Sequence, residues 1–435
     1  MKVAAAALFA ALFMTGARAE ANGAFPDSIQ VLLPAGHPHQ IILATNFGLV
    51  VSNDDGANFD FVCEAAIASY VSMYALGPGP GDRLYAVTPS GIRYSSDGAC
   101  TWSSSTGDLA GPTDLFVDAS DATHLFAIGT ERTDGNVNAA GLYESHDSGA
   151  SFPGPPVYST VPGQGLTGIE ISRSNPSIVY LARFQNAPAD PAILSSSDAG
   201  KTFVEHEEGG TLTDLLRIAE VDPQNPLKLF LRSSASAPNN NDSLVVSEDG
   251  GQTVSVRQAL QGRMSAFLHS VSGAIYFGGL IINDDGTIGN SEAYKSTDGG
   301  KTFTPWTTAP RLRALAERDQ KIYAAGDNFK DHFALGVSSD NGVSFQPLVR
   351  FDQIRGPMAC GDLPTTCATP WASISSLFGI ADAGLADAGA TTPKSSGCDY
   401  ARDSGSSWPF LGGLGLLLSV IGLVWLLGSK RSRLP

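Results

Sequence analysis

The octet STDGGKTF, at residues 296–303, is one of seven copies of a single pattern in this chain of 435 residues. Each copy has Ser first and Asp third, and most have Gly fifth, a small polar residue seventh and an aromatic residue eighth. Successive aspartates lie 43, 50, 51, 51, 49 and 42 residues apart. So even a period is typical of a fold in which one supersecondary unit is repeated. The copies begin at Ser52, Ser95, Ser145, Ser196, Ser247, Ser296 and Ser338.

Two strand-like runs precede each octet at similar offsets, as at residues 212–221 and 227–232, which the turn DPQNP separates. A third strand leads into the octet and a fourth leaves it, so each unit is predicted to hold four strands. Four-stranded units of this length, repeated seven times, predict an all-β fold. We therefore expect a seven-bladed β-propeller of four-stranded blades over residues 28–351.

The octet resembles the Asp-box, or BNR repeat, SxDxGxTW, of sialidases, sortilin-type receptors and many bacterial propellers. The resemblance covers about three quarters of the chain, with departures at Asn58, Ala99 and Val254. A carboxylate in such a tight turn can accept several backbone N–H bonds, while Gly supplies a positive φ and the aromatic ring fills space between blades. We therefore expect a structural role for the octet aspartates, which are Asp54, Asp97, Asp147, Asp198, Asp249, Asp298 and Asp340.

The composition excludes several classes of protein. With 48 Gly, 26 Pro and only 16% charged residues, the chain favours short strands joined by turns over long amphipathic helices. The formal net charge is −16, and an acidic body repels phosphate backbones, so a nucleic-acid partner is not expected. The chain has no phosphate loop, dinucleotide fingerprint, HExxH motif or nucleophile elbow. No cofactor and no metal site is predicted.

Both ends of the chain carry targeting signals. Lys2, an apolar run at 3–14 and the small-x-small site at 17–19 predict a secretory signal peptide over residues 1–19. A retained membrane helix is the alternative, but the run is shorter than the ~20 residues that span a bilayer. Residues 410–428 form a chargeless apolar segment of spanning length, followed by a basic tail at 429–435, which predicts a transmembrane helix with a cytoplasmic end.

Cys398 follows Gly397 and precedes a polar spacer and this apolar segment. The four parts in this order resemble the MYXO-CTERM sorting signal of myxobacterial surface proteins. The resemblance implies transfer to the cell surface and removal of the helix by a dedicated sorting protease near Cys398; a plain single-pass anchor is the alternative. Residues 381–407, rich in Ala, Asp, Gly and Ser, are expected to be a flexible linker.

The other four cysteines, Cys63, Cys100, Cys360 and Cys367, form an even set in a chain predicted to be exported, so two disulfides are expected. Three pairings are possible. The short spacing favours Cys360 with Cys367, which leaves Cys63 with Cys100. A zinc site is the alternative, but neither the spacing nor nearby histidines support it. Residues 352–380 are expected to be a disulfide-containing cap, with a short helix at 372–378 that seals the last blade.

Two classes of function fit an exported propeller: a non-catalytic binding module and an exo-glycosidase of the sialidase class. A sialidase needs an arginine cluster for the substrate carboxylate, a Tyr–Glu pair and a general acid. Residues 20–51 contain no arginine, although the family's Arg-Ile-Pro signature should stand there. The candidates for a central channel are Arg217, Arg311 and Arg313 on predicted first strands; ion-paired structural arginines are the alternative. We therefore favour binding over hydrolysis.

Four consecutive repeats have long insertions between their second and third strands, at residues 132–140, 184–191, 233–242 and 281–291. Since strand connections alternate between faces, these loops should lie opposite the octet turns. Long insertions on one face of a repeat scaffold commonly carry binding. A glycan or protein ligand is expected there. Oxygen-rich runs in two loops match no complete calcium pattern, and Asx turns explain them. The candidate ligand residues are Arg132, Phe184, Asn241, Asp284 and Asp285.

Overall fold

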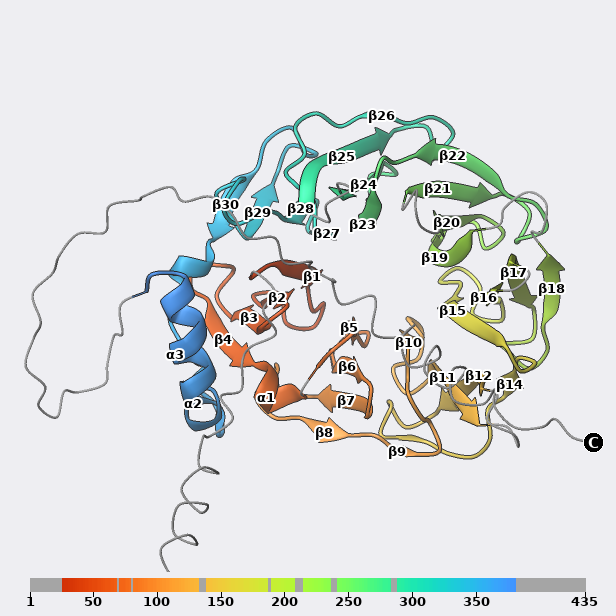
Figure 1. The fold of residues 1–435 in the computed structure, drawn as a ribbon, viewed down its shortest axis with the longest axis horizontal. Helices are drawn as coiled ribbons and strands as arrows, with labels where there is room; N and C mark the ends of the chain where they lie inside the picture. Colours follow the sequence, from red (N-terminus) through yellow and green to blue (C-terminus); the bar gives the residue numbers. More distant parts are fainter. Residues whose placement is uncertain are drawn as a thin grey trace, which may run out of the picture.

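The computed structural model describes residues 26–380 apart from 69, 80, 133–137, 187–188, 208–213, 236–240 and 283–287. Seven four-stranded antiparallel sheets form a ring around a central axis (Figure 1). The predicted seven-bladed propeller with four-stranded blades is confirmed. The signal peptide, linker, transmembrane helix, basic tail and Cys398 lie outside the described residues. Within the described part of the chain, no helix has the length and apolar character needed to cross a bilayer.

Each blade is built from four strands in chain order, and in blade 3 the short strand β13 intervenes before the fourth strand. Blade 1 holds β1 (Ser28–Leu32), β2 (Ile41–Thr45), β3 (Gly48–Ser52) and β4 (Asp60–Cys63); blade 2 holds β5 (Met73–Leu76), β6 (Leu84–Thr88), β7 (Gly91–Ser95) and β8 (Ser103–Ser104); blade 3 holds β10 (Asp114–Val117), β11 (Leu125–Arg132), β12 (Asn138–Ser145) and β14 (Tyr158–Ser159). The short strands β9 (Thr106–Gly107) and β13 (Ser151–Phe152) pair in parallel between these two blades.

The remaining blades follow the same order. Blade 4 holds β15 (Gln164–Ile171), β16 (Val179–Asn186), β17 (Ala189–Ser196) and β18 (Val204–Glu207); blade 5 holds β19 (Leu215–Val221), β20 (Leu229–Ser234), β21 (Asp242–Ser247) and β22 (Ser255–Ala259). Blade 6 holds β23 (Arg263–His269), β24 (Ile275–Ile282), β25 (Ile288–Ser296) and β26 (Thr304–Pro305); blade 7 holds β27 (Ala314–Arg318), β28 (Lys321–Ala325), β29 (Leu335–Ser338) and β30 (Gln346–Val349). The helices are α1 (Glu64–Ile67), η1 (Phe351–Gln353), α2 (Leu363–Thr366) and α3 (Ala368–Leu377).

The apolar core lies between the blades. Every residue of β2 and β3 is buried, because both faces of the middle strands pack against neighbouring sheets. Five of the six core clusters each join two successive blades, and the largest joins blades 7, 1 and 2 with the C-terminal helices. Blades therefore depend on their neighbours for burial, which is why the array folds as one domain.

Each octet forms the turn between the third and fourth strands of its blade. In blade 6, Asp298 Oδ1 accepts hydrogen bonds from the Ser296 hydroxyl (2.7 Å) and the Thr302 N–H (3.0 Å), and Oδ2 accepts the Thr302 hydroxyl (2.6 Å). The same three bonds recur at the other six aspartates, except that at Asp54 the Asn58 side-chain amide donates in place of the hydroxyl. Both carboxylate oxygens are thus occupied within the turn. Because strands alternate in direction, these turns share one face, here called the octet face.

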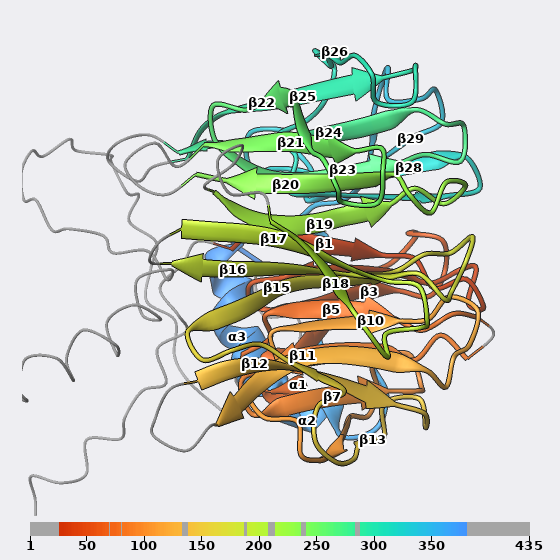
Figure 2. The same ribbon diagram turned by 90° about the vertical axis from the view of Figure 1, so that its right-hand side faces the viewer.

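The opposite face carries the connections between second and third strands, and we call it the hairpin face. Both ends of each predicted long loop belong to the flanking strands, which corrects the bounds of the loops. Arg132 pairs with Asn138, Asn186 with Ala189, and Ser234 with Asp242, so the inserted residues lengthen two strands. Pairing satisfies the backbone N–H and C=O groups that a long open loop would leave to water. The ends of β16 and β17 project at this side in Figure 2.

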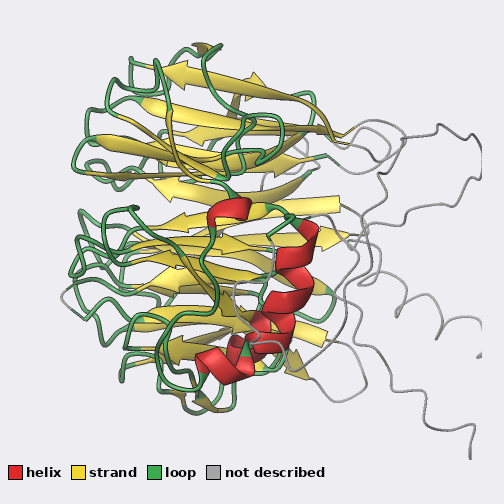
Figure 3. Cartoon of the chain, turned by 90° about the vertical axis from the view of Figure 1, so that its left-hand side faces the viewer, coloured by secondary structure: helices red, strands yellow, loops and turns green. Residues whose placement is uncertain are grey.

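The C-terminal segment crosses from blade 7 to the outer edge of blade 1. The Phe61 N–H donates to Gly356 O (2.7 Å) and the Met358 N–H donates to Phe61 O (2.9 Å), so this segment pairs with β4. Helix α3 then lies along blade 1 (Figure 3), where the Trp371 ring packs 5.5 Å from Phe61. The predicted helix therefore exists, but it covers blade 1 and not the last blade. Pairing with β4 is the reason, because it carries the chain past blade 7 before the helix begins.

The predicted disulfide pairing is wrong. The structure joins Cys63 to Cys367 and Cys100 to Cys360, across sequence separations of 304 and 260 residues. Sequence spacing favoured a local Cys360–Cys367 bond, but the segment beside β4 brings each of these cysteines to a different partner. The two bonds tie the cap that follows blade 7 to blades 1 and 2, so they close the ring covalently.

Candidate functional site

A cluster of three arginines lies between blades 5 and 6, at the hairpin-face ends of their strands. Arg217 of the innermost strand β19 stands directly opposite Arg232 of β20 in the register, so both side chains leave the same side of the sheet. Arg263 begins β23, the innermost strand of blade 6. We call Arg217, Arg232 and Arg263 the arginine cluster. Like charges directly opposite each other on a sheet are destabilising unless an anion compensates them.

Asp242 holds two of the three arginines. Its Oδ2 lies 2.6 Å from Arg232 Nε and its Oδ1 lies 2.9 Å from Arg263 Nη1. The Asp242 side chain is fully buried, and Oδ2 also accepts the Met264 N–H at 2.7 Å. A buried carboxylate shared by two guanidinium groups fixes both of them in place. Asp242 therefore positions Arg232 and Arg263, and its two oxygens are already engaged.

Arg217 is the member of the cluster that lacks such a partner. Its residue is exposed, and it makes no hydrogen bond or ion pair with another described residue. Burial, followed by the neighbouring Arg232 guanidinium, lowers the pKa of Arg217 below its ordinary value, although Asp114 and Asp242 oppose this. The Arg217 side chain is thus accessible to solvent and yet closely surrounded by protein. Arg217 is therefore available to an incoming anion.

Asp114, from the innermost strand of blade 3, compensates this charge incompletely. Burial raises the pKa of Asp114 to about 6, although the N–H groups of Leu115 (2.9 Å) and Ile169 (3.2 Å) stabilise its charged form. A carboxyl group with a raised pKa carries less than a full negative charge near neutral pH. Within an acidic protein, the arginine cluster is thus a local positive site. Guanidinium groups bind carboxylates and phosphates through paired N–H donors.

Of the three predicted channel arginines, the structure brings only Arg217 to this cluster. Strand β27 begins at Ala314, so Arg311 and Arg313 precede the inner strand, which corrects their predicted placement. Arg311 Nη1 pairs with Asp331 (3.1 Å), and Arg313 pairs with Asp27 (2.6 Å) and Asp327 (3.6 Å). The Arg311–Asp331 pair lies within blade 7, whereas Arg313 joins blade 7 to Asp27 at the start of blade 1. Of the two arginines, Arg313 therefore contributes to ring closure.

Sequence reasoning missed Arg232, Arg263 and Asp242. Arg263 begins an innermost strand, as Arg217 lies on one. A division of blade 6 into its strands would therefore have indicated Arg263 as well. Arg232 lies on a second strand, and the position of Asp242 falls in a predicted loop, so neither position indicated the cluster. Their contact depends on how blades 5 and 6 pack.

The predicted ligand residues do not form one site. Asn241 is exposed and directly precedes Asp242, so it borders the arginine cluster. Phe184 is half-buried in β16 of blade 4, where it pairs with Gly165. Arg132 ends β11, but its side chain is outside the described part, and Asp284 and Asp285 lie outside the described residues altogether.

A hollow of about 620 Å³ between blades 3 and 4 is the other candidate on the hairpin face. Its lining includes Tyr158, Gln164, Arg183, Asp190 and Glu205. The Arg183 side chain is 1% exposed and is paired with both acidic residues. Its charge is already neutralised within the protein. This hollow is therefore a weaker anion site than the arginine cluster.

An acidic pair follows further along the inner strands, toward the octet face. Burial raises the pKa of Glu170 to about 8, and the nearby Glu220 carboxylate adds to the shift. His269 Nδ1 lies 3.2 Å from Glu220 Oε2, and this contact raises the pKa of His269. Glu220 lies three residues after Arg217 on β19, which is about 10 Å along an extended strand. The inner strands thus hold a carboxyl group that is protonated at neutral pH.

No protein-family model and no curated protein matches this chain. The GH74 xyloglucanase from Xanthomonas campestris is 14% identical, with a TM-score of 0.38 over 73% of this chain and 57% of that chain. An ancestral GH74 enzyme is 10% identical, with a TM-score of 0.44 over 75% of this chain and 55% of that chain. YCF48 from Cyanidioschyzon merolae is 9% identical, with a TM-score of 0.42 over 69% of this chain and 92% of that chain. This chain spans little more than half of these two GH74 structures, and the likeness is one of fold alone.

Proposed function

We propose that this protein is a surface-anchored, non-catalytic binding module whose arginine cluster binds a carboxylate-bearing glycan or protein ligand. The observation that carries the proposal is Arg217, an exposed cation without a hydrogen bond or ion pair to a described residue, beside two arginines that Asp242 holds in place. A bidentate carboxylate between Arg217 and Arg232 would relieve their repulsion. The octet aspartates, by contrast, already use both carboxylate oxygens within their own turns.

The position of the cluster supports a recognition role. Arg232 lies two residues before the end of β20, and Arg263 pairs with Leu280 close to the end of β24, so the cluster lies near the base of two hairpins. Polar hairpin residues such as Asn241 can contact the part of a ligand that extends beyond its carboxylate. Rigid strands holding the cations and adjustable hairpins around them are a common arrangement for binding on a repeat scaffold.

The test is calorimetric titration of the whole chain with sialyl- and glucuronyl-terminated oligosaccharides, their neutral counterparts, and peptides with free or amidated C-termini. Arg217→Ala should weaken binding of the carboxylate form about tenfold or more, because a hydrogen bond to a charged group contributes roughly 1.5–3 kcal/mol. Arg173→Ala is the matched control, since Arg173 is exposed in the β15–β16 turn on the octet face. Equal losses in both variants, or equal affinity for carboxylate and neutral ligands, would refute the proposal.

Hydrolysis of an acidic glycoside is the second candidate. Glu170 favours it, because a carboxyl group with a pKa of about 8 can act as a general acid at neutral pH. Its side chain is buried, however, and residue Glu170 is only 8% exposed. Turnover of a fluorogenic sialoside that is lost in both Arg217→Ala and Glu170→Gln would establish hydrolysis and overturn the binding-only proposal.

Export and anchoring belong to the same proposal. Residues 1–19 would direct secretion, and residues 410–428 would hold the propeller at the envelope until a sorting protease acts near Cys398. Mass spectrometry of the protein from its native envelope tests this. A mature chain that ends upstream of residue 410 supports processing, whereas an intact C-terminus supports a permanent anchor.

A further inference from the structure

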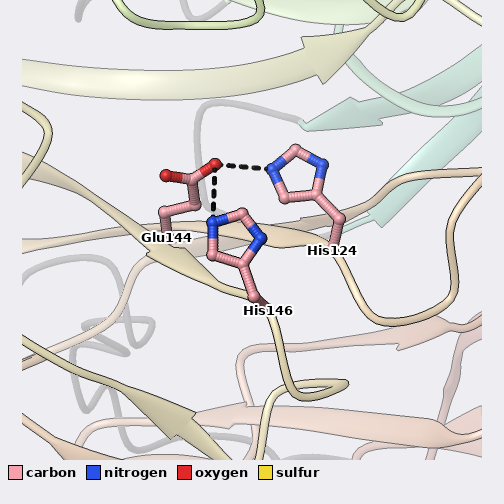
Figure 4. Close-up of side chains that lie close together, drawn as sticks. All are labelled: His124, Glu144 and His146. Atoms are coloured by element: carbon pink, nitrogen blue, oxygen red, sulfur yellow. Dashed lines mark hydrogen bonds and ion pairs between the residues drawn. The ribbon is translucent and has the colours of Figure 1, made fainter.

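Two histidines and a glutamate meet on the octet face of blade 3, away from the arginine cluster. His124 ends the β10–β11 turn, Glu144 lies in β12, and His146 is the second residue of the blade 3 octet. One ligand atom from each lies within 4.8 Å of the other two, and this trio is the only such group among the described residues. Figure 4 shows the Glu144 carboxylate facing both rings.

The hydrogen bonds around His124 leave a place for a cation. Asp118 Oδ2 lies 3.1 Å from His124 Nδ1, and Glu144 Oε1 lies 2.8 Å from His124 Nε2. In the tautomer that donates Nδ1–H to Asp118, the Nε2 lone pair of His124 and Glu144 Oε1 face each other, as two ligand atoms around one cation do. Glu144 Oε1 is also 3.3 Å from His146 Nε2, which repeats the arrangement.

We propose that His124, Glu144 and His146 bind a zinc ion. Imidazole nitrogens with one carboxylate are a ligand set typical of zinc, and hard cations such as Ca²⁺ or Mg²⁺ prefer oxygen ligands alone. Asp118 would act as the outer carboxylate that holds the metal-bound histidine in the correct tautomer and orientation. Three protein ligands leave a fourth position open to solvent or to an exogenous ligand.

The framework of the site is already in place. Asp118 Oδ1 accepts the N–H (2.8 Å) and the hydroxyl (2.6 Å) of Ser120, and the Ser148 N–H donates to Thr123 O at 3.0 Å. These bonds fix the turn that carries His124 against the octet that carries His146. The His124 side chain is 13% exposed and that of His146 is 72% exposed. The His146 ring stacks on that of His124, with 5.2 Å between centroids, and its exposure lets it turn to reach the ~2.0–2.1 Å that a zinc–nitrogen bond requires.

The ion would join the β10–β11 turn to the octet turn of the same blade. Among the described residues no other octet carries an equivalent trio. In blade 1 the corresponding turn places His39 Nδ1 2.7 Å from Asp55 Oδ2. Neither the binding proposal nor its test depends on this site, which lies on the opposite face. Zinc here would stabilise one blade and present one open coordination position.

Calorimetric titration of the metal-free whole chain with ZnCl₂ tests the proposal. Wild-type protein should bind zinc, and His146→Ala and Glu144→Gln should each weaken that binding by more than the ~10–100-fold typical of losing an outer-shell partner. Asp118→Asn changes a positioning residue and should weaken zinc binding by ~10–100-fold. His39→Ala is the matched control and should bind as wild type does.

A second measurement separates binding from a folding defect. In chelator, His146→Ala should unfold at the wild-type temperature, because this side chain is exposed; with zinc, only wild type and His39→Ala should gain thermal stability. Cobalt(II) should give visible absorption bands of a tetrahedral site in wild type and not in His146→Ala. Zinc affinity that is absent in wild type, or unchanged in both His146→Ala and Glu144→Gln, would overturn the proposal.

Discussion

Removal of the disulfide between Cys63 and Cys367 tests how the propeller ring is closed. The change is the double substitution Cys63→Ala and Cys367→Ala, which leaves no free thiol and no buried hydroxyl at either position. Both residues are at most 1% exposed. The bond joins residues 304 apart, but the Cys100–Cys360 bond still ties the cap to blade 2 in this variant. Loss of the Cys63–Cys367 bond therefore opens only the loop that the two disulfides close together.

That path runs over the 37 residues from Cys63 to Cys100 and the 7 from Cys360 to Cys367, about 44 in all. The chain-entropy relation gives about 4 kcal/mol for a loop of that size, and removal of either bond alone should cost at most this much. Removal of both bonds should cost up to about 9.6 kcal/mol, because the second loss also opens a loop of 260 residues. The combined loss should thus exceed the sum of the single losses by about 1.6 kcal/mol.

The measurement is guanidinium denaturation of wild type and of three variants, which lack the Cys63–Cys367 bond, the Cys100–Cys360 bond or both. Proteolytic mapping of wild type under non-reducing conditions accompanies it. Local pairing of Cys360 with Cys367 and of Cys63 with Cys100 would close two separate loops, whose losses add. Additive free energies of unfolding, or a linked peptide that contains Cys360 and Cys367, would refute the ring-closing arrangement. Linked peptides that join Cys63 to Cys367 and Cys100 to Cys360, with a combined loss of stability above the sum of the single losses, support it.

Three further predictions concern single residues. Because the pKa of Glu170 is raised in the folded state, the wild type should lose up to about 1.4 kcal/mol of stability per pH unit as pH rises from about 4.5 to 8. Glu170→Gln should abolish this pH dependence, and urea unfolding across that range measures it. Hydrogen bonds lower the pKa of Asp198 to about 2, so the stability difference between wild type and Asp198→Asn should close as pH falls from 4 to 2 in the same assay. Gly48→Ala should lower the thermal unfolding temperature more than Gly91→Ala does. The two φ angles are alike, at +135° and +137°, but only at Gly48 would an added Cβ clash with Val62 O.

The octet pattern predicted the architecture because its information is local and repeated. A Ser, an Asp and a hydroxyl residue within seven positions supply most of the bonds of the turn, so the turn can be recognised without distant contacts. Hydrophobic runs before and after each turn then predicted four strands per unit. The count of seven blades followed from the count of octets.

Individual site residues were harder to predict, because their roles depend on contacts between blades. Arg217, Arg311 and Arg313 looked alike in sequence. Arg311 pairs with an aspartate of blade 7 and Arg313 with Asp27 just before blade 1, whereas Arg217 lies opposite Arg232. His124 and Glu144 are 20 residues apart and meet only through the pairing of β11 with β12. Spacing along the chain carries no direct signal of such meetings.

The sequence by itself determined the repeat, the seven four-stranded blades and the turn that ends each third strand, since these depend on hydrogen bonds within a few residues and on alternating burial. Only the tertiary structure decided which cysteines pair, where the final helix docks and which cations lack a partner. Ring closure brings Cys63 to Cys367 and Cys100 to Cys360, and blade packing brings Asp242 between Arg232 and Arg263. These contacts join segments that the chain order separates, so their energies arise only once the propeller has closed.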